Sequence, residues 1–312
     1  MIRQLGLMLA AGLLSALMFL SLAKGIALGA LLSYLAPLPL MMAGLALGTK
    51  AAVAAAGVAA VAVAAGSGWF AALPFAVAAA VPALLVSNRA LLWRRAADGS
   101  AEWYPPGLVL AWLTAAGLGL MLCGTAFLLG SADGIEANVA QLLGRTLDLM
   151  AGHFPAQQRE ALVKLVAPLF LALMATSWLV MVVLNAVAAQ GLLARLGHAR
   201  RPSPAYRELR LPDWLGFALV AVVVLAVAVR GDVGYVAGNA AGVLLVPFMF
   251  LGLAGIHRWA RGRPNGGLLL AVAYGLLFLA NGWAAVAVAG LGLVRFWTMR
   301  FRRHDSGGGM EG

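Results

Sequence analysis

Apolar runs of about 20 residues, each closed by a charged or turn-forming residue, recur along the whole of this 312-residue chain. A helix needs about 20 such residues to cross the hydrocarbon core of a bilayer, where its backbone polar groups have no water to bind. Only 11% of the residues are charged and 63% are apolar, whereas a soluble domain carries about 25% charged residues. The sequence therefore predicts an all-α fold, a polytopic transmembrane helical bundle.

Cutting the apolar runs at charges and turn signals yields ten predicted spans. They lie near 5–23, 26–48, 51–66, 69–87, 106–130, 162–189, 214–229, 234–256, 267–281 and 283–299. The last two are separated because Asn281-Gly282 is a turn signal, and a continuous tilted helix over 267–299 would reduce the total to nine. All ten belong to a single predicted membrane domain, 1–304, which is followed by a disordered cytoplasmic tail, 305–312.

The first span also has the features of a signal peptide. Arg3 precedes the apolar run Leu5–Leu20, and the small residues Ser21 and Ala23 imitate a cleavage site. A second long span follows at once, so we expect the first span to be retained as a membrane anchor.

The positions of the basic residues indicate the orientation of the chain. With ten spans and a cytoplasmic N-terminus, 17 of the 22 basic residues fall on the inside. These are Arg3, Lys50, Arg89, Arg94, Arg95, Arg195, Arg200, Arg201, Arg207, Arg210, Arg258, Arg261, Arg263, Arg295, Arg300, Arg302 and Arg303. Because cytoplasmic loops are enriched in Lys and Arg, we expect a multi-pass protein of the bacterial cytoplasmic (inner) membrane with both termini cytoplasmic. The net charge of +11 then reflects orientation, and no nucleic-acid partner is expected.

The long outside connection contains a helical pattern at 134–151. Ile135, Val139, Leu142 and Leu143 begin a series of apolar residues spaced three and four apart, with polar residues between them. The pattern predicts an amphipathic helix, and two interpretations remain open: a connector lying on the outer membrane interface, or a lid over an outward-facing cavity.

The second span is interrupted by Pro37 and Pro39, which must kink or break its helix. Broken membrane helices often line substrate sites in transporters, although a simple packing kink is an equal alternative.

Three asparagines lie within or between the predicted spans: Asn185, Asn239 and Asn281. Their side-chain amides should face the protein interior, either as links between helices or as ligand contacts. We therefore select Tyr34, Pro37, Asn185 and Asn239 as candidate ligand-binding residues beneath the 134–151 helix.

Residue types that carry catalysis or hold metals are sparse. The single cysteine, Cys123, lies in an apolar run, and His153, His198, His257 and His304 are scattered through loops and span ends. No zinc-type spacing, Walker loop or nucleophile elbow is present. We expect no cofactor, no metal site and no enzymatic activity.

Short motifs in the C-terminal third resemble the YybS-like family of predicted bacterial membrane proteins, a domain of unknown function. In order, the motifs are Leu211-Pro212-Asp213-Trp214, Asn239, Pro247-Phe248, Leu251–His257 and Leu291–Trp297, with Arg300 after them. Ala36–Pro39 followed by Gly44 is also similar to that family. The resemblance extends remotely to the substrate-binding components of energy-coupling-factor vitamin transporters and to the rod-shape protein MreD. The family often has an aspartate where this chain has Arg295, so a role that depends on an acid there does not carry over.

Two functions remain in competition. The first is a small-molecule binding or transport component that uses the candidate residues named above. The second is a membrane scaffold or assembly factor that recruits anionic lipid or a membrane protein partner through cytoplasmic arginines. For this role the candidates are Arg200, Arg201, Arg258, Arg261, Arg302 and Arg303.

Overall fold

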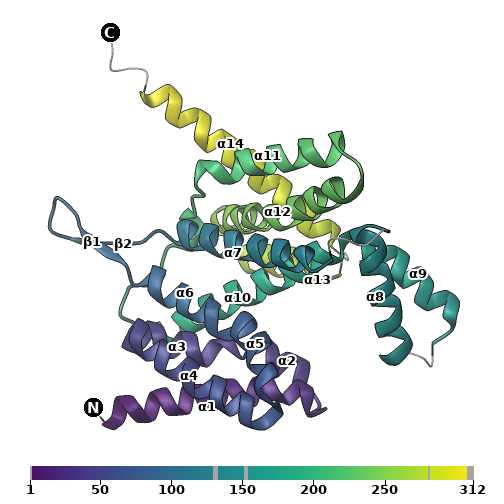
Figure 1. Ribbon diagram of the computed structural model, residues 1–312. Coiled ribbons are helices and arrows are strands. Elements are labelled where there is room, and N and C mark those ends of the chain that lie inside the picture. The colour runs from purple at the N-terminus through teal and green to yellow at the C-terminus, as the bar shows by residue number, and fades with distance from the viewer. Residues whose placement is uncertain (1, 129–132, 151–153, 280–281, 308–312) are drawn as a thin grey trace. The chain divides into compact units, whose positions relative to one another are not determined.

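The computed structural model describes residues 2–128, 133–150, 154–279 and 282–307, and the side chains of residues 278 and 303–307 lie outside this description. Helices make up most of the described chain (Figure 1), which confirms the predicted all-α helical bundle. The described chain contains eight candidate membrane spans that are long and apolar enough to cross a bilayer, and three of them, Gly29–Leu47, Trp69–Ala90 and Ala156–Arg195, are each built from two or more consecutive helical elements. Two shorter apolar helices occupy the remaining predicted segments, near 214–229 and 267–281.

The chain divides into two compact units, and the predicted membrane domain 1–304 contains residues of both. Unit 1 comprises Met1–Leu113 and Trp178–Ala205, and unit 2 comprises Thr114–Ser177 and Tyr206–Gly312. The boundaries fall inside two helices, α7 (Pro106–Ala126) and α10 (Phe170–Arg195), which therefore contribute residues to both units.

Unit 1 is built mainly from closely packed helices rich in small residues. They are α1 (Ile2–Ala23), α2 (Gly29–Tyr34), α3 (Pro37–Leu47), α4 (Thr49–Ser67), α5 (Ala72–Phe75), α6 (Val81–Ala90) and the second part of α10, with short turns η1 (Trp69–Ala71) and η2 (Ala76–Ala80) around α5. Ala52, Ala55 and Ala59 of α4 are fully buried. At Gly12 of α1, an added Cβ would lie only 2.5 Å from the Ala55 carbonyl oxygen. Such small side chains let membrane helices approach closely and associate through packing.

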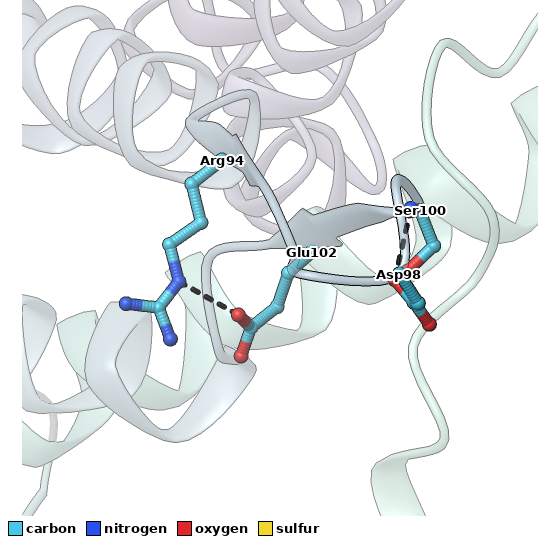
Figure 2. Close-up of polar contacts among 4 residues, drawn as sticks. All are labelled: Arg94, Asp98, Ser100 and Glu102. Carbon is cyan, nitrogen blue, oxygen red and sulfur yellow. Dashed lines mark hydrogen bonds and ion pairs between the residues drawn. The ribbon is translucent and has the colours of Figure 1, made fainter.

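Between α6 and α7 the structure contains a β-hairpin that the sequence did not predict. Strand β1 (Trp93–Arg95) pairs antiparallel with β2 (Ala101–Trp103), placing Trp93 opposite Trp103 and Arg94 opposite Glu102. Figure 2 shows the Arg94–Glu102 ion pair, 2.6 Å between Nε and Oε2, and the contact between Asp98 and Ser100 in the connecting loop. Strands of three residues are too short to produce a readable alternation of polar and apolar residues.

Unit 2 is centred on three packed helices, α11 (Asp213–Ala228), α12 (Gly231–Ala260) and α14 (Trp283–Gly307). The other elements of this unit are α8 (Ile135–Met150), α9 (Ala156–Val166), η3 (Ala167–Leu169), η4 (Tyr206–Glu208) and α13 (Gly266–Leu279). The stretch 267–299 contains two helices, α13 and α14, and Gly282 before α14 has a φ of +90° that glycine adopts without strain. Asn281, the other half of the expected turn, lies outside the described residues.

The amphipathic segment expected at 134–151 contains α8, and α9 packs beside it (Figure 1). Ile135 and Val139 in the first turns of α8 are buried, whereas Leu149 near its end is 87% exposed. The start of α8 is therefore fixed against unit 2, while much of its apolar face is uncovered by the described chain. The predicted tail at 305–312 is described only as the last helical turn of α14, through Gly307.

Candidate functional site

Three of the four candidate ligand-binding residues meet in unit 1, where the second predicted span breaks between α2 and α3. Pro37 begins α3, and the Leu38 amide donates to the Leu35 carbonyl (3.0 Å) in a tightened turn. Asn185 of α10 donates from Nδ2 to the Tyr34 carbonyl and to the Met181 carbonyl, both at 2.8 Å. The break is thus linked to α10 through the Asn185 side chain.

The chemistry of this cluster is that of an interhelical connection. Asn185 is only 3% exposed, and both of its amide hydrogens are used by protein carbonyls. Ser15 of α1 donates to the Ala36 carbonyl at 2.7 Å, so a second backbone group at the break also has a side-chain partner. Tyr34, by contrast, is exposed.

Asn239, the fourth candidate, belongs to unit 2 and stabilises a different proline break. Its Oδ1 accepts from the Ala172 amide (2.8 Å), and its Nδ2 donates to the carbonyls of Pro168 (3.0 Å) and Tyr235 (2.9 Å). The hydroxyl of Tyr235 donates to the Ala167 carbonyl at 2.8 Å. Both side chains come from α12 and satisfy the 3-10 turn η3 that separates α9 from α10.

Another such connection joins α10 to the turn before α6. Residues 76–80 form a π-helical turn, in which the carbonyl of Val77 would need the amide of Pro82, and proline has no N–H. The indole Nε1 of Trp178 donates to the Val77 carbonyl instead, at 2.9 Å. Sequence reasoning missed Pro82, Pro168 and Tyr235, although a proline inside an apolar run was a usable signal for the first two.

Unit 2 has an open depression of ≈ 420 Å³ at the start of α8 and of α12. It is lined by Asp133, Gly134, Glu136, Ala226, Val229, Arg230, Gly231, Asp232, Gly234 and Tyr235. Asp133, Glu136, Arg230 and Asp232 lie in connections that ten spans and a cytoplasmic N-terminus predict to be on the outer side. In the described parts of the chain, no three His, Cys, Asp or Glu residues gather closely enough to hold a metal ion.

Asp232 fixes the geometry of this depression. Its Oδ1 accepts from the Ile135 amide at 2.7 Å, although 97 residues separate the two. A carboxylate at a helix N-terminus satisfies an amide without an intrahelical partner and interacts favourably with the helix dipole. The first turn of α12 is thereby linked to the start of α8, and the sequence offered no local signal of this pairing.

The arginines proposed as lipid or partner contacts differ sharply in exposure. In unit 1, Arg200 is exposed, but Arg201 is only 6% exposed and donates from Nη1 to the carbonyls of Ala90 (2.8 Å) and Tyr104 (3.4 Å). In unit 2, Arg258, Arg261 and Arg302 are exposed. The side chain of Arg303 lies outside the described residues.

Several of the motif residues of the C-terminal third contact one another inside unit 2. Arg300 pairs with Asp213 at the start of α11 (Nη1 to Oδ2, 3.0 Å), and its guanidinium carbon lies 4.6 Å from the centre of the Phe217 ring. Arg295 donates to the carbonyls of Leu251 (3.0 Å) and Arg207 (3.1 Å). These two arginines therefore join α14 to neighbouring elements.

Comparison with known proteins gives the family but no close relative. The family described as "Predicted membrane protein (DUF2232)" matches residues 12–294, from the first predicted span into the last. No curated protein and no solved structure matches the chain. With most of its length covered, this chain belongs to the DUF2232 family of predicted membrane proteins, in agreement with its YybS-like motifs.

Proposed function

We propose that this protein is a non-enzymatic, multi-pass component of the bacterial cytoplasmic membrane that binds or transports a small molecule, with both termini cytoplasmic. The observation that carries the proposal is the depression beside the start of α8, which is of the size that small-molecule sites have, roughly 300–1,000 Å³. The remote resemblance to vitamin-transporter substrate-binding components points to the same class of activity.

The lining suggests the chemistry of the ligand. Asp133, Glu136 and Asp232 contribute carboxylates and Arg230 one guanidinium, and Tyr235 lies beside them. Because the acids outnumber the base, a small polar molecule with an amine or another cationic group would be favoured electrostatically. Asn185 and Asn239 then serve mainly as supports of the bundle, because protein groups already use their amide hydrogens.

A thermal-shift screen of the detergent-purified full chain tests the proposal. The panel holds cationic vitamins such as thiamine, nucleobases and polyamines, and a true ligand at 100 times its Kd stabilises the protein by about 2.7 kcal/mol. The variant Glu136→Gln should abolish the shift, because it removes one carboxylate from the depression while keeping the side-chain shape.

The matched control is Glu160→Gln, which removes the same charge from an exposed position of α9 outside the depression. It should leave the ligand shift intact. If no compound in the panel stabilises the protein, or if both variants lose the shift equally, the proposed site is wrong.

A scaffold that recruits anionic lipid or a membrane protein partner is the second candidate. Its specific support is the division of the arginines into two groups: Arg201, Arg295 and Arg300 bind within the protein, whereas Arg200, Arg258 and Arg261 are exposed. A triple Arg→Gln variant of the exposed group should lose a stoichiometric partner in pull-downs from solubilised membranes. If the wild-type chain retrieves no partner, the recruitment of a protein fails.

A further inference from the structure

The β1–β2 hairpin is braced more strongly than a short connection between two helices requires. Isolated two-stranded hairpins are only marginally stable in water. Here Arg201 is buried at the base of the hairpin and donates to the Ala90 carbonyl before β1 and to the Tyr104 carbonyl after β2. Its guanidinium carbon lies 5.7 Å from the centre of the Trp103 ring. The hairpin is therefore held in a set direction relative to the ends of α6 and α7.

The two faces of the hairpin carry different chemistry. Successive side chains of a strand point to opposite faces, so Trp93 and Arg95 share one face with their partners Trp103 and Ala101. The two indole rings are 6.5 Å apart, and Trp93 is 58% exposed. We name this side the tryptophan face, and Arg95 is the only charged residue among its four strand positions.

The opposite face is electrically neutral. It holds Arg94 and Glu102, which form the exposed ion pair shown in Figure 2. The Arg94 guanidinium lowers the pKa of Glu102, and the carboxylate raises that of Arg94, mainly through their hydrogen bond. The net positive charge of the strands therefore lies on the tryptophan face.

Connectivity places the hairpin at a membrane surface. The candidate spans on either side end at Ala90 and begin again at Pro106, so the strands start and finish within three residues of them. The distribution of basic residues assigns this surface to the cytoplasm. Tryptophan is enriched at the headgroup level, and the cytoplasmic leaflet carries anionic lipids that attract arginine.

We propose that the tryptophan face of the hairpin binds the cytoplasmic membrane surface, with Trp93 at the headgroup level and Arg95 on anionic phospholipid. This inference depends on the orientation of the chain and is independent of a small-molecule ligand. The neutral face remains in water.

Site-directed spin labelling of the full chain in vesicles tests the proposal. In a Cys123→Ser background, Ala101→Cys places a label on the tryptophan face and Arg94→Cys places its matched control on the neutral face. The vesicles contain phosphatidylcholine with or without phosphatidylglycerol. With the anionic lipid, the label at 101 should be several-fold more accessible to oxygen than to a water-soluble nickel chelate, and the label at 94 should show the reverse.

Two results would overturn the proposal. Equal access of the nickel chelate to both labels would mean that the hairpin stands in water. Protection of the label at 101 from both reagents would mean that protein, including a second copy of this chain, covers the tryptophan face.

The role of Arg95 needs a separate variant. Adding Arg95→Gln to the label at 101 should reduce its oxygen accessibility in anionic vesicles and leave it unchanged in pure phosphatidylcholine. The same reduction in both lipids would indicate a disturbed hairpin, and no reduction in either would show that anionic lipid is not recognised, so both results contradict the assignment of Arg95.

Discussion

Asn185, Trp178 and Asn239 all donate hydrogen bonds to backbone carbonyls at places where a proline interrupts a membrane helix. In lipid, a carbonyl that loses its helical N–H partner at such a break has no water from which to accept a hydrogen bond, so a neighbouring side chain has to supply the donor. Each of these polar residues costs free energy at membrane depth unless it is paired, and here each has a protein partner. Their placement explains how helices that are interrupted by prolines still have their backbone groups satisfied.

Removing the Asn239 amide should destabilise the protein clearly. Asn239→Ala leaves the Ala172 amide and the Pro168 carbonyl without their side-chain partner, and unsatisfied buried groups cost about 1–3 kcal/mol each. Unfolding in mixed detergent micelles measures the loss. Asn265→Ala, at an exposed position before α13, is the control and should change the stability by less than about 0.5 kcal/mol. Equal effects of the two substitutions would contradict the role given to Asn239.

The loop of the hairpin should open at acid pH. The amide and hydroxyl of Ser100 donate to Asp98 Oδ1 and lower the pKa of that carboxyl below its ordinary value of 3.8. A lowered pKa means that the carboxylate stabilises the loop above pH 3.8 and that the stabilisation is lost as the pH falls through the lowered value. A spin label at Ala97→Cys in a Cys123→Ser background should gain mobility in that range.

Ser100→Ala provides the comparison for this titration. It removes the hydroxyl donor, which is the largest cause of the shift, and should raise the pH at which mobility increases. An unchanged midpoint would show that the Asp98–Ser100 contact does not order the loop.

Helix pairs in this protein approach closely through glycine. Where α12 and α14 pack together, an added Cβ at Gly252 would clash with the Val288 carbonyl, and one at Gly292 would clash with the Phe248 carbonyl. The contacts are reciprocal, since each helix presents glycine to the backbone of the other. The rings of Phe248 and Phe296 also pack together between these two helices, with 5.3 Å between their centroids. Small and large side chains therefore alternate along the interface.

Enlarging the α12–α14 contact should weaken unit 2. Gly292→Ala forces the two backbones apart and should cost about 1–3 kcal/mol, the usual range for overpacking. Gly290→Ala in the same helix has open space around the new methyl group and should be neutral, or stabilising by up to about 1 kcal/mol through helix propensity. Both are measured by the same micelle unfolding assay. A cost for Gly290→Ala as large as that for Gly292→Ala would contradict the glycine-mediated packing.

Helix length bears on how many times the chain crosses the membrane. Eight candidate spans of the described chain are long enough to cross a bilayer, but α11 has only 16 residues and α13 has 14. At 1.5 Å per residue, α11 covers about 24 Å, less than the usual ~30 Å core. The bilayer can thin around a short span at modest cost, so both helices are compatible with the ten-span arrangement.

Cysteine labelling of intact cells tests whether α11 crosses the membrane. In a Cys123→Ser background, Arg230→Cys should react with an impermeant maleimide from outside, and Arg210→Cys should react only after permeabilisation. The two positions flank α11 and are both exposed. Labelling of both positions from the same side would mean that α11 does not span, and the even number of spans would then be wrong.

The sequence predicted only part of the candidate site. Pro37 marked the break in the second span, and Asn185 was expected in the interior, which its 3% exposure matches. Asp232 had no local signal, because its partner Ile135 is 97 residues away. Arg201 and Arg200 are neighbours with the same side chain, yet one is buried and one exposed, a difference that depends on where the carbonyls of Ala90 and Tyr104 lie.

The sequence by itself determined that this protein is a predominantly helical membrane protein and where its long apolar helices lie. Long apolar runs in lipid have to satisfy their own backbone, and a helix does so locally. Three features were decided only by the tertiary structure. They are the side chain that bonds to the backbone at each proline break, the residue at which α8 starts, and the hairpin formed by residues 93–103. These outcomes depend on contacts between distant parts of the chain, such as Asn185 and Tyr34 at a separation of 151 residues, and local patterns contain no information about such pairs.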